Sequence, residues 1–181
     1  MLNTYVVYVE NKPGVLTRVA SLFRRRAFNI DSLTVGRTEK PEVSRMTITV
    51  DADDDQAKRI EANLYKLVNV LLVENISHQP AIVRDLAMIK VAATHDARSH
   101  VLELASVFRA RVVDVSPESL TIEITGAEDK IDGLLEVLRP YGVIEMVRTG
   151  IVAMRRGNSP STKTVGPDDR EVAGNDVSYS V

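Results

Sequence analysis

Residues 4–27 read TYVVYVENKPGVLTRVASLFRRRA and decide the fold of the chain that follows. The first seven residues are rich in β-branched and aromatic side chains, which favour a strand. The next four, NKPG at 11–14, have the composition of a turn. From residue 15 to 27 the apolar side chains recur at helical spacing and share one face. The segment therefore predicts a strand joined by a tight turn to an amphipathic helix.

The alternation of strands and helices continues beyond this segment. We expect strands at 30–37 and 43–50, joined by a polar hairpin loop, and another at 70–76. The acidic residues at 53–55 offer N-caps for a second helix. Its apolar side chains follow at helical spacing: Ala57, Ile60, Leu64 and Leu67. The order of these elements is βαββαβ.

The same order then repeats after a junction near Gln79 and Pro80. The second set is expected as strands at 86–93, 112–115, 120–125 and 143–147, the last continued at 150–154, and helices at 97–109 and 128–138. The sequence thus predicts an α+β protein of two ferredoxin-like domains, at 1–78 and 79–156. Residues 157–181 are polar and rich in Gly, Ser, Pro and Asp, so we expect a disordered C-terminal tail.

A βαββαβ unit forms a four-stranded antiparallel sheet with both helices on one face. Its other face and its strand edges are then bare, and a unit of this size buries only a thin core. This geometry favours pairing with a second copy of the chain, so we expect a homo-oligomer.

Composition excludes several functional classes. The chain of 181 residues has no cysteine, so a disulfide scaffold, a thiolate metal site and a cysteine nucleophile are excluded. Outside the expected tail, basic and acidic residues balance, which gives no electrostatic reason for a nucleic-acid or membrane partner. The apolar runs are too short to cross a bilayer, and we expect no signal peptide, because strand-like residues begin at Leu2. We expect a cytoplasmic protein.

No arrangement of residues in the sequence is typical of a catalytic or metal site. The three histidines, His78, His95 and His100, lack zinc-ligand spacing and are expected at the surface. The acidic run at 53–55 fits a helix N-terminus better than a cation site. The basic run at 24–26 could touch phosphate, but the solvated end of an amphipathic helix is the commoner explanation.

The βαββαβ order is shared with RNA-recognition modules, which makes RNA binding an alternative. That function needs aromatic side chains on the central strands to stack on bases. Tyr5 and Tyr8 lie on opposite faces of the first strand, and the strand at 43–50 has no aromatic residue. The sequence therefore disfavours RNA binding.

The turn at 11–14 is the most informative candidate site. It leads into a helix N-terminus, where free N–H groups and the helix dipole favour a carboxylate. Gly14 lacks a Cβ, so a ligand can approach the backbone, and Asn11 offers both a donor and an acceptor. Val15 and Leu16 are candidates for an apolar wall. The alternative is that Asn, Pro and Gly are ordinary turn and cap residues without a ligand.

Several blocks of sequence resemble the regulatory small subunit of acetolactate synthase, also called acetohydroxyacid synthase. They are NKPGVLTR at 11–18, LFRRR at 22–26, NIDSLTV at 29–35, SRMTI at 44–48, YKLVNV at 65–70 and FRARVVDV at 108–115. The resemblance covers residues 1–156. It implies an N-terminal ACT domain followed by a second ferredoxin-like domain.

The resemblance also implies a function without catalysis in this chain. Members of the family bind a separate catalytic subunit, raise its activity and confer feedback inhibition by branched-chain amino acids, usually valine. Thiamine diphosphate, magnesium and FAD belong to that catalytic subunit, which condenses two pyruvates, or pyruvate with 2-oxobutanoate, in valine, leucine and isoleucine synthesis. A free-standing ACT sensor of another amino acid is the alternative, which the blocks at 29–35 and 44–48 disfavour.

The resemblance places the effector at the interface of an ACT-domain homodimer. Its site residues in this chain would be Asn11, Gly14, Val15 and Leu16 from one subunit, facing Asn29 and Ile30 of the neighbouring subunit. One methylene more or less changes the binding free energy by only about 1–3 kcal/mol, so these residues do not show which of valine, leucine and isoleucine binds best.

Overall fold

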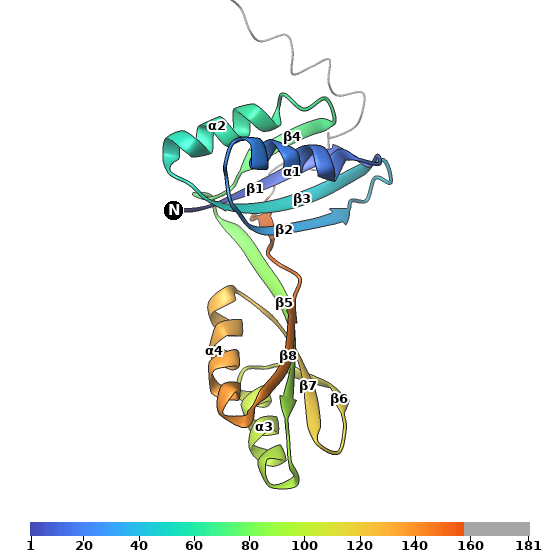
Figure 1. Ribbon diagram of the computed structural model, residues 1–181, viewed down its shortest axis with the longest axis vertical. Helices are drawn as coiled ribbons and strands as arrows, with labels where there is room; N and C mark the ends of the chain where they lie inside the picture. Colours follow the sequence, from blue (N-terminus) through green and yellow to red (C-terminus); the bar gives the residue numbers. More distant parts are fainter. Residues whose placement is uncertain (158–181) are drawn as a thin grey trace, which may run out of the picture. The chain divides into compact units, whose positions relative to one another are not determined.

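The computed structural model of the protein describes residues 1–157, which form two compact units. The first unit holds Met1–Ile82 together with the described residues from Ala153 onward, and the second holds Val83–Val152. In each unit two helices cover one face of an antiparallel sheet (Figure 1). This confirms the α+β class and the doubled βαββαβ order. The tail expected at 157–181 lies, except for its first residue, outside the described residues.

The first unit contains a four-stranded sheet and two helices. Its elements are β1 (Leu2–Glu10), α1 (Val15–Arg25), β2 (Ile30–Arg37), β3 (Val43–Asp51), α2 (Asp54–Leu64) and β4 (Val70–Asn75). The strands lie in the order β2-β3-β1-β4, so β2 and β4 are the edges. Glu10 pairs with Val43 at one end of the sheet. At the other end Val50 pairs with both Asn3 and Ile30.

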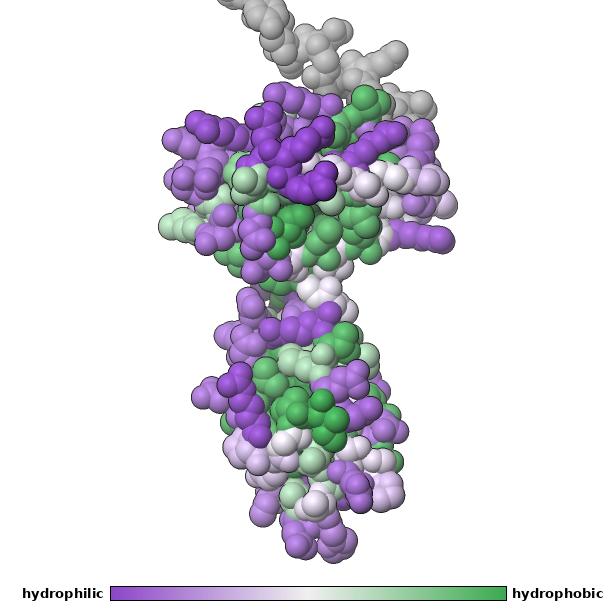
Figure 2. Space-filling view, viewed as in Figure 1, coloured by the Kyte–Doolittle hydropathy of each residue, from purple (hydrophilic) through white to green (hydrophobic). Residues whose placement is uncertain are grey.

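One apolar face of each element forms the core of the first unit. Val19, Leu22 and Phe23 share the buried face of α1. Tyr5 and Val7, two positions apart on β1, point toward the helices and are fully buried. The outer sides of α1 and α2 are charged, and Figure 2 shows hydrophilic side chains gathered over these helices.

The acidic run before α2 caps that helix. Asp53 accepts a hydrogen bond from the backbone N–H of Gln56 at 2.8 Å, and the Gln56 side chain accepts one from the Asp53 N–H at 3.0 Å. Asp54 and Asp55 lie in the first turn, where carboxylates suit the positive end of the helix dipole. The predicted helix start is therefore confirmed.

The helix-free face of the first sheet is not bare, contrary to the expectation from the βαββαβ pattern. Val6 points to this face, yet it is only 1% exposed. Arg45, on the same face, donates a hydrogen bond to the carbonyl oxygen of Ala153. Arg155 pairs with Glu74 at 3.2 Å. The returning chain thus binds this face, and the edges of the sheet are what it leaves for pairing with a second copy.

The rest of the described chain forms a five-stranded sheet and two further helices. Its elements are β5 (Ala81–Ala92), α3 (His95–Val107), β6 (Arg111–Val115), β7 (Ser119–Gly126), α4 (Glu128–Leu138), the short η1 (Arg139–Tyr141), β8 (Val143–Arg148) and β9 (Val152–Arg155). The strand order is β6-β7-β5-β8, and β9 also pairs with β5. The second unit ends at Val152, short of the boundary expected at 156, because β9 is a separate strand and not a continuation of β8.

β5 begins five residues before the strand expected at 86–93. Two charged residues, Arg84 and Asp85, interrupt the apolar alternation there and hide the start of the strand in the sequence. Asp85 is buried because Arg148 Nε lies 3.2 Å from its carboxylate and Thr149 Oγ1 donates a hydrogen bond to it at 3.0 Å. The ion pair with Arg148, which is distant in sequence, therefore allows the Asp85 carboxylate to be buried within β5.

None of the helices in residues 1–157 is long and apolar enough to cross a membrane.

Tyr5 makes the core of the first unit sensitive to high pH. Its hydroxyl donates a hydrogen bond to the carbonyl oxygen of Ala57 at 3.2 Å. Burial, and to a smaller extent the negative charge of Glu61, raises the pKa of Tyr5 from 10.0 to about 12. The unfolded chain therefore loses this proton before the folded one. Below pH 10 the contribution of Tyr5 is constant, and between pH 10 and 12 the free energy of unfolding falls by about 1.4 kcal/mol per pH unit.

We expect urea denaturation to reveal this fall as a difference between the wild-type chain and the Tyr5→Phe variant. Phenylalanine keeps the ring but cannot ionise, so the variant reports the pH dependence of all other groups. Equal slopes for the two proteins between about pH 10 and 12 would contradict the raised pKa.

Candidate functional site

The turn between β1 and α1 is held in place by the hairpin loop between β2 and β3. The backbone N–H of Asn11 donates to the carbonyl oxygen of Glu42 at 2.7 Å, and Asn11 Nδ2 donates to that of Pro41 at 2.9 Å. Asn11 is exposed, and its Oδ1 receives no hydrogen bond from any described residue. The side chain thus presents a carbonyl oxygen in a fixed position at the surface.

Gly14 ends the turn in a conformation that favours glycine. Its φ is +81°, in the left-handed region, and it occupies the N-cap position of α1. No heavy atom lies within 4 Å of the position that a Cβ would take, so the space beside the backbone is open. A ligand can therefore approach the first turn of α1 closely.

The N-terminus of α1 differs from those of the other three α-helices in the described part of the chain. α1 has neither a side-chain cap nor an acidic residue in its first turn. The capping box satisfies α2, while α3 carries Asp96 and α4 carries Glu128 and Asp129 in their first turns. The free N–H groups and the positive dipole end of α1 thus lack a negative group of their own, which suits an external carboxylate.

The two apolar residues that open α1 have different surroundings. Val15 is 4% exposed and belongs to the core of the first unit. Leu16 is 44% exposed and supplies the apolar surface next to the turn. The side chain of Leu16, and not that of Val15, is therefore accessible to a ligand in a single chain.

Asn29 and Ile30 lie at the opposite end of the first sheet from the turn. Asn29 is exposed and directly precedes β2, whose first residue, Ile30, pairs with Val50. The turn follows Glu10, at the other end of β1, about 23 Å away at 3.3 Å per residue. One chain brings Asn11, Gly14, Val15 and Leu16 together but does not bring Asn29 and Ile30 to them.

A polar network that the sequence did not reveal anchors the turn to β4. Asn69 Nδ2 donates to Glu10 Oε2 at 2.5 Å, and Arg18 donates to Asn69 Oδ1. Lys12 Nζ lies 3.3 Å from the Glu10 carboxylate. Asn69 is distant from the turn in sequence, so no local pattern identifies its role. The network fixes the first turns of α1 relative to the sheet.

The histidines and acidic residues of the described chain do not gather into a metal site. Within residues 1–157, no group of three or more His, Asp or Glu side chains could hold a metal ion. His78, His95 and His100 are exposed, as expected. Tyr5 and Tyr8 are both buried, so the first strand presents no aromatic face on which an RNA base could stack.

The first unit combines a ferredoxin-like fold with an open glycine turn before its first helix. Its residues 6–72 match a family model described as an "AHAS small subunit-like ACT domain", so it is an ACT domain, a class that fits a regulatory role. Residues 84–157 match a second model, described as "Small subunit of acetolactate synthase".

Relatives extend these matches over most of the chain. A probable acetolactate synthase small subunit of Archaeoglobus fulgidus is 50% identical over 87% of this chain and 99% of its own length. The acetolactate synthase small subunit of Mycolicibacterium smegmatis is 49% identical, over 86% of this chain and 91% of its own. A crystal structure of the Thermotoga maritima small subunit matches with a TM-score of 0.83 at 42% identity, over 88% and 99% of the two chains. The chain belongs to the acetolactate synthase small-subunit family.

The uncompensated N-terminus of α1 leads to a prediction about stability. Thr17 is exposed in the first turn of α1. We expect Thr17→Glu to raise the free energy of unfolding by about 0.3–1 kcal/mol relative to Thr17→Gln at low ionic strength, because only glutamate adds a charge near the free N–H groups. Urea denaturation measures the difference, and added salt should reduce it. Equal stability of the two variants at low salt would refute the electrostatic description of this terminus.

Proposed function

We propose that this chain activates the catalytic subunit of acetolactate synthase and makes it sensitive to feedback inhibition by a branched-chain amino acid, with valine the first candidate. The observation that carries the proposal is a match to small subunits over most of the chain, combined with a helix N-terminus open to a carboxylate. The partner would hold thiamine diphosphate, magnesium and FAD and would condense the 2-oxo acids. The complex would act in the cytoplasm, in valine, leucine and isoleucine synthesis.

The turn at 11–14 supports recognition of a free amino acid by its charged groups. The backbone N–H groups of Leu16 and Thr17 would bind the carboxylate, since that of Val15 already donates to the carbonyl oxygen of Lys12 and the first turn has no acidic residue. Asn11 Oδ1 would accept a hydrogen bond from the ammonium group. Leu16 would contact the aliphatic side chain, while Val15 would hold the turn against the core.

A second copy of the chain would supply Asn29 and Ile30. The β2 edge of the first sheet has no strand beyond it in the described chain. Antiparallel pairing of two such edges places the first residues of β2 in one copy beside the last residues of β2 in the other. That end of the sheet carries the turn, so a two-fold axis would form two equivalent sites from both groups of residues.

A ligand bound between two copies would act as a regulator by stabilising one arrangement of the subunits. It binds only the associated state and therefore shifts the equilibrium toward that state. Typical allosteric coupling energies are about 1–3 kcal/mol, which a few hydrogen bonds to ordered backbone groups supply.

Reconstitution tests the proposed function. The purified chain is added to the cognate catalytic subunit, and acetolactate formation is measured with and without valine, leucine and isoleucine. We expect the chain to raise the activity and at least one of these amino acids to inhibit only the reconstituted complex. The proposal is wrong if neither the activity nor its inhibition changes on adding the chain.

Gly14→Asp tests the placement of the effector site. We expect this variant to stimulate the catalytic subunit normally but to require at least about tenfold more effector for half inhibition, because the new carboxylate repels that of the ligand. Gly14→Asn is the matched control, since Asn has the same shape without the charge and tolerates the left-handed conformation equally well. Unaltered inhibition of Gly14→Asp would refute the placement of the carboxylate at this turn.

A further inference from the structure

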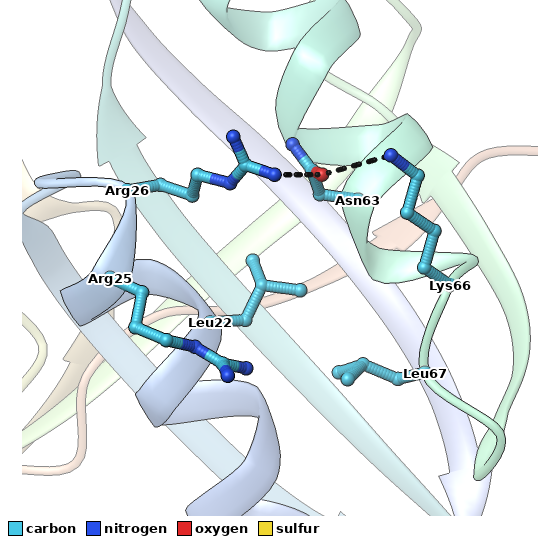
Figure 3. A pocket seen from close by; sticks show the side chains of 6 residues that line it. All are labelled: Leu22, Arg25, Arg26, Asn63, Lys66 and Leu67. Carbon is cyan, nitrogen blue, oxygen red and sulfur yellow. Dashed lines mark hydrogen bonds between the residues drawn. The ribbon is translucent and has the colours of Figure 1, made fainter.

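A pocket lies between the ends of α1 and α2 on the helical side of the first unit. It has a volume of about 470 Å³, and its lining residues come from two segments of the chain: Leu22, Arg25, Arg26, Asn63, Lys66 and Leu67 (Figure 3). The pocket shares no residue with the effector site proposed above. It is therefore a second candidate binding region in the same domain.

Three cationic side chains and no acidic residue line this pocket. Arg25 and Arg26 come from the end of α1, and Lys66 follows α2. Within residues 1–157, none of these three side chains forms an ion pair with a carboxylate. Like charges gathered in one concave surface repel each other, and an anion relieves this repulsion.

A buried amide holds two of the three cations in place. Asn63 is 9% exposed, and its Nδ2 donates to the carbonyl oxygen of Arg59 at 2.7 Å. Its Oδ1 accepts hydrogen bonds from Arg26 Nη2 at 3.3 Å and from Lys66 Nζ at 3.5 Å (Figure 3). A neutral oxygen orients these side chains without cancelling their charge. Their remaining donors are free to bind a ligand.

Two leucines give the pocket an apolar part. The side chains of Leu22 and Leu67 extend toward each other, with the Arg25 guanidinium beside them (Figure 3). Apolar walls reduce the screening of nearby charges by water, which strengthens the attraction of an anion. The combination of cations and an apolar floor suits a small organic anion better than a bare surface patch does.

We propose that this pocket binds a small polyvalent oxyanion, in the form of a phosphate ester or a polycarboxylate. Guanidinium groups match the geometry of both phosphate and carboxylate through paired N–H donors, and the lysine ammonium adds a third charge. The volume lies within the range of small-metabolite sites, about 300–1,000 Å³. All three arginines of the basic run 24–26 are exposed, but only Arg24 does not line the pocket, so the solvated-helix-end interpretation then applies to Arg24.

Calorimetric titration of the purified chain with pyrophosphate, and separately with citrate, tests the proposal. Sodium chloride keeps the ionic strength constant, so that a change in bulk screening is not mistaken for binding. We expect saturable binding of at least one of the two anions, with one anion per chain. Pyrophosphate alone identifies a phosphate ligand, citrate alone a carboxylate ligand, and both together a general oxyanion site.

Matched variants distinguish the pocket from the overall charge of the chain. We expect Arg26→Gln and Lys66→Gln each to weaken binding by at least about tenfold, because each removes a charged donor. Arg24→Gln removes the same charge two residues before Arg26, at a side chain that does not line the pocket, and should change the affinity less than about twofold. Asn63→Asp places a carboxylate between the cations and should abolish binding; because it also removes the Nδ2 donor to Arg59, a thermal scan checks that this variant is still folded.

The proposal is overturned if neither anion binds, or if Arg24→Gln weakens binding as much as Arg26→Gln does. Binding of an oligoglutamate peptide without binding of either small anion would also overturn it and would indicate a protein-binding surface. Because the test needs neither the catalytic subunit nor valine, its failure would leave the proposed function untouched.

Discussion

A sheet that carries both of its helices on one face has to satisfy its second face and its edges in another way. In the first unit the returning chain binds the second face. Arg45 contacts the backbone of Ala153 and also lies over the ring of Tyr8, 5.7 Å from its centre. The edges are left, and β2 is one of them. An exposed strand edge favours pairing with a second copy, which supports the proposed edge-to-edge dimer, in which two copies would share the proposed effector site.

Elements with strong local signals could be predicted from the sequence. β2 and α4 have the predicted bounds, because turn residues or an acidic first turn delimit them and their periodicity is unbroken. The start of β5 and the separate strand β9 could not be predicted. Both depend on partners far along the chain, as the burial of Asp85 by Arg148 shows. A local pattern contains no information about such partners.

The candidate site was predictable to a similar extent. Composition identified the turn, because the effect of a glycine on the backbone before a helix depends only on its immediate neighbours in sequence. The phase of the helix, which buries Val15 and exposes Leu16, needed the packed structure. The basic run shows the same limit. Only the fold reveals that Arg25 and Arg26 line the same pocket as Lys66, which is distant in sequence. Two side chains of a run interpreted from its sequence as a solvated helix end therefore line a pocket.

Both proposed ligands relate to the electrostatics of one helix. α1 contains three arginines and no acidic residue, so the positive end of its dipole has no negative side chain nearby, while Arg24 and Arg25 suit the negative end but repel each other. An anion at the N-terminus would interact with the uncompensated dipole, and one at the C-terminus would reduce the repulsion among the cations. The buried face of α1, with Val19, Leu22 and Phe23, fixes both of its ends against the same sheet, so the two proposed ligands would bind at opposite ends of one packed element.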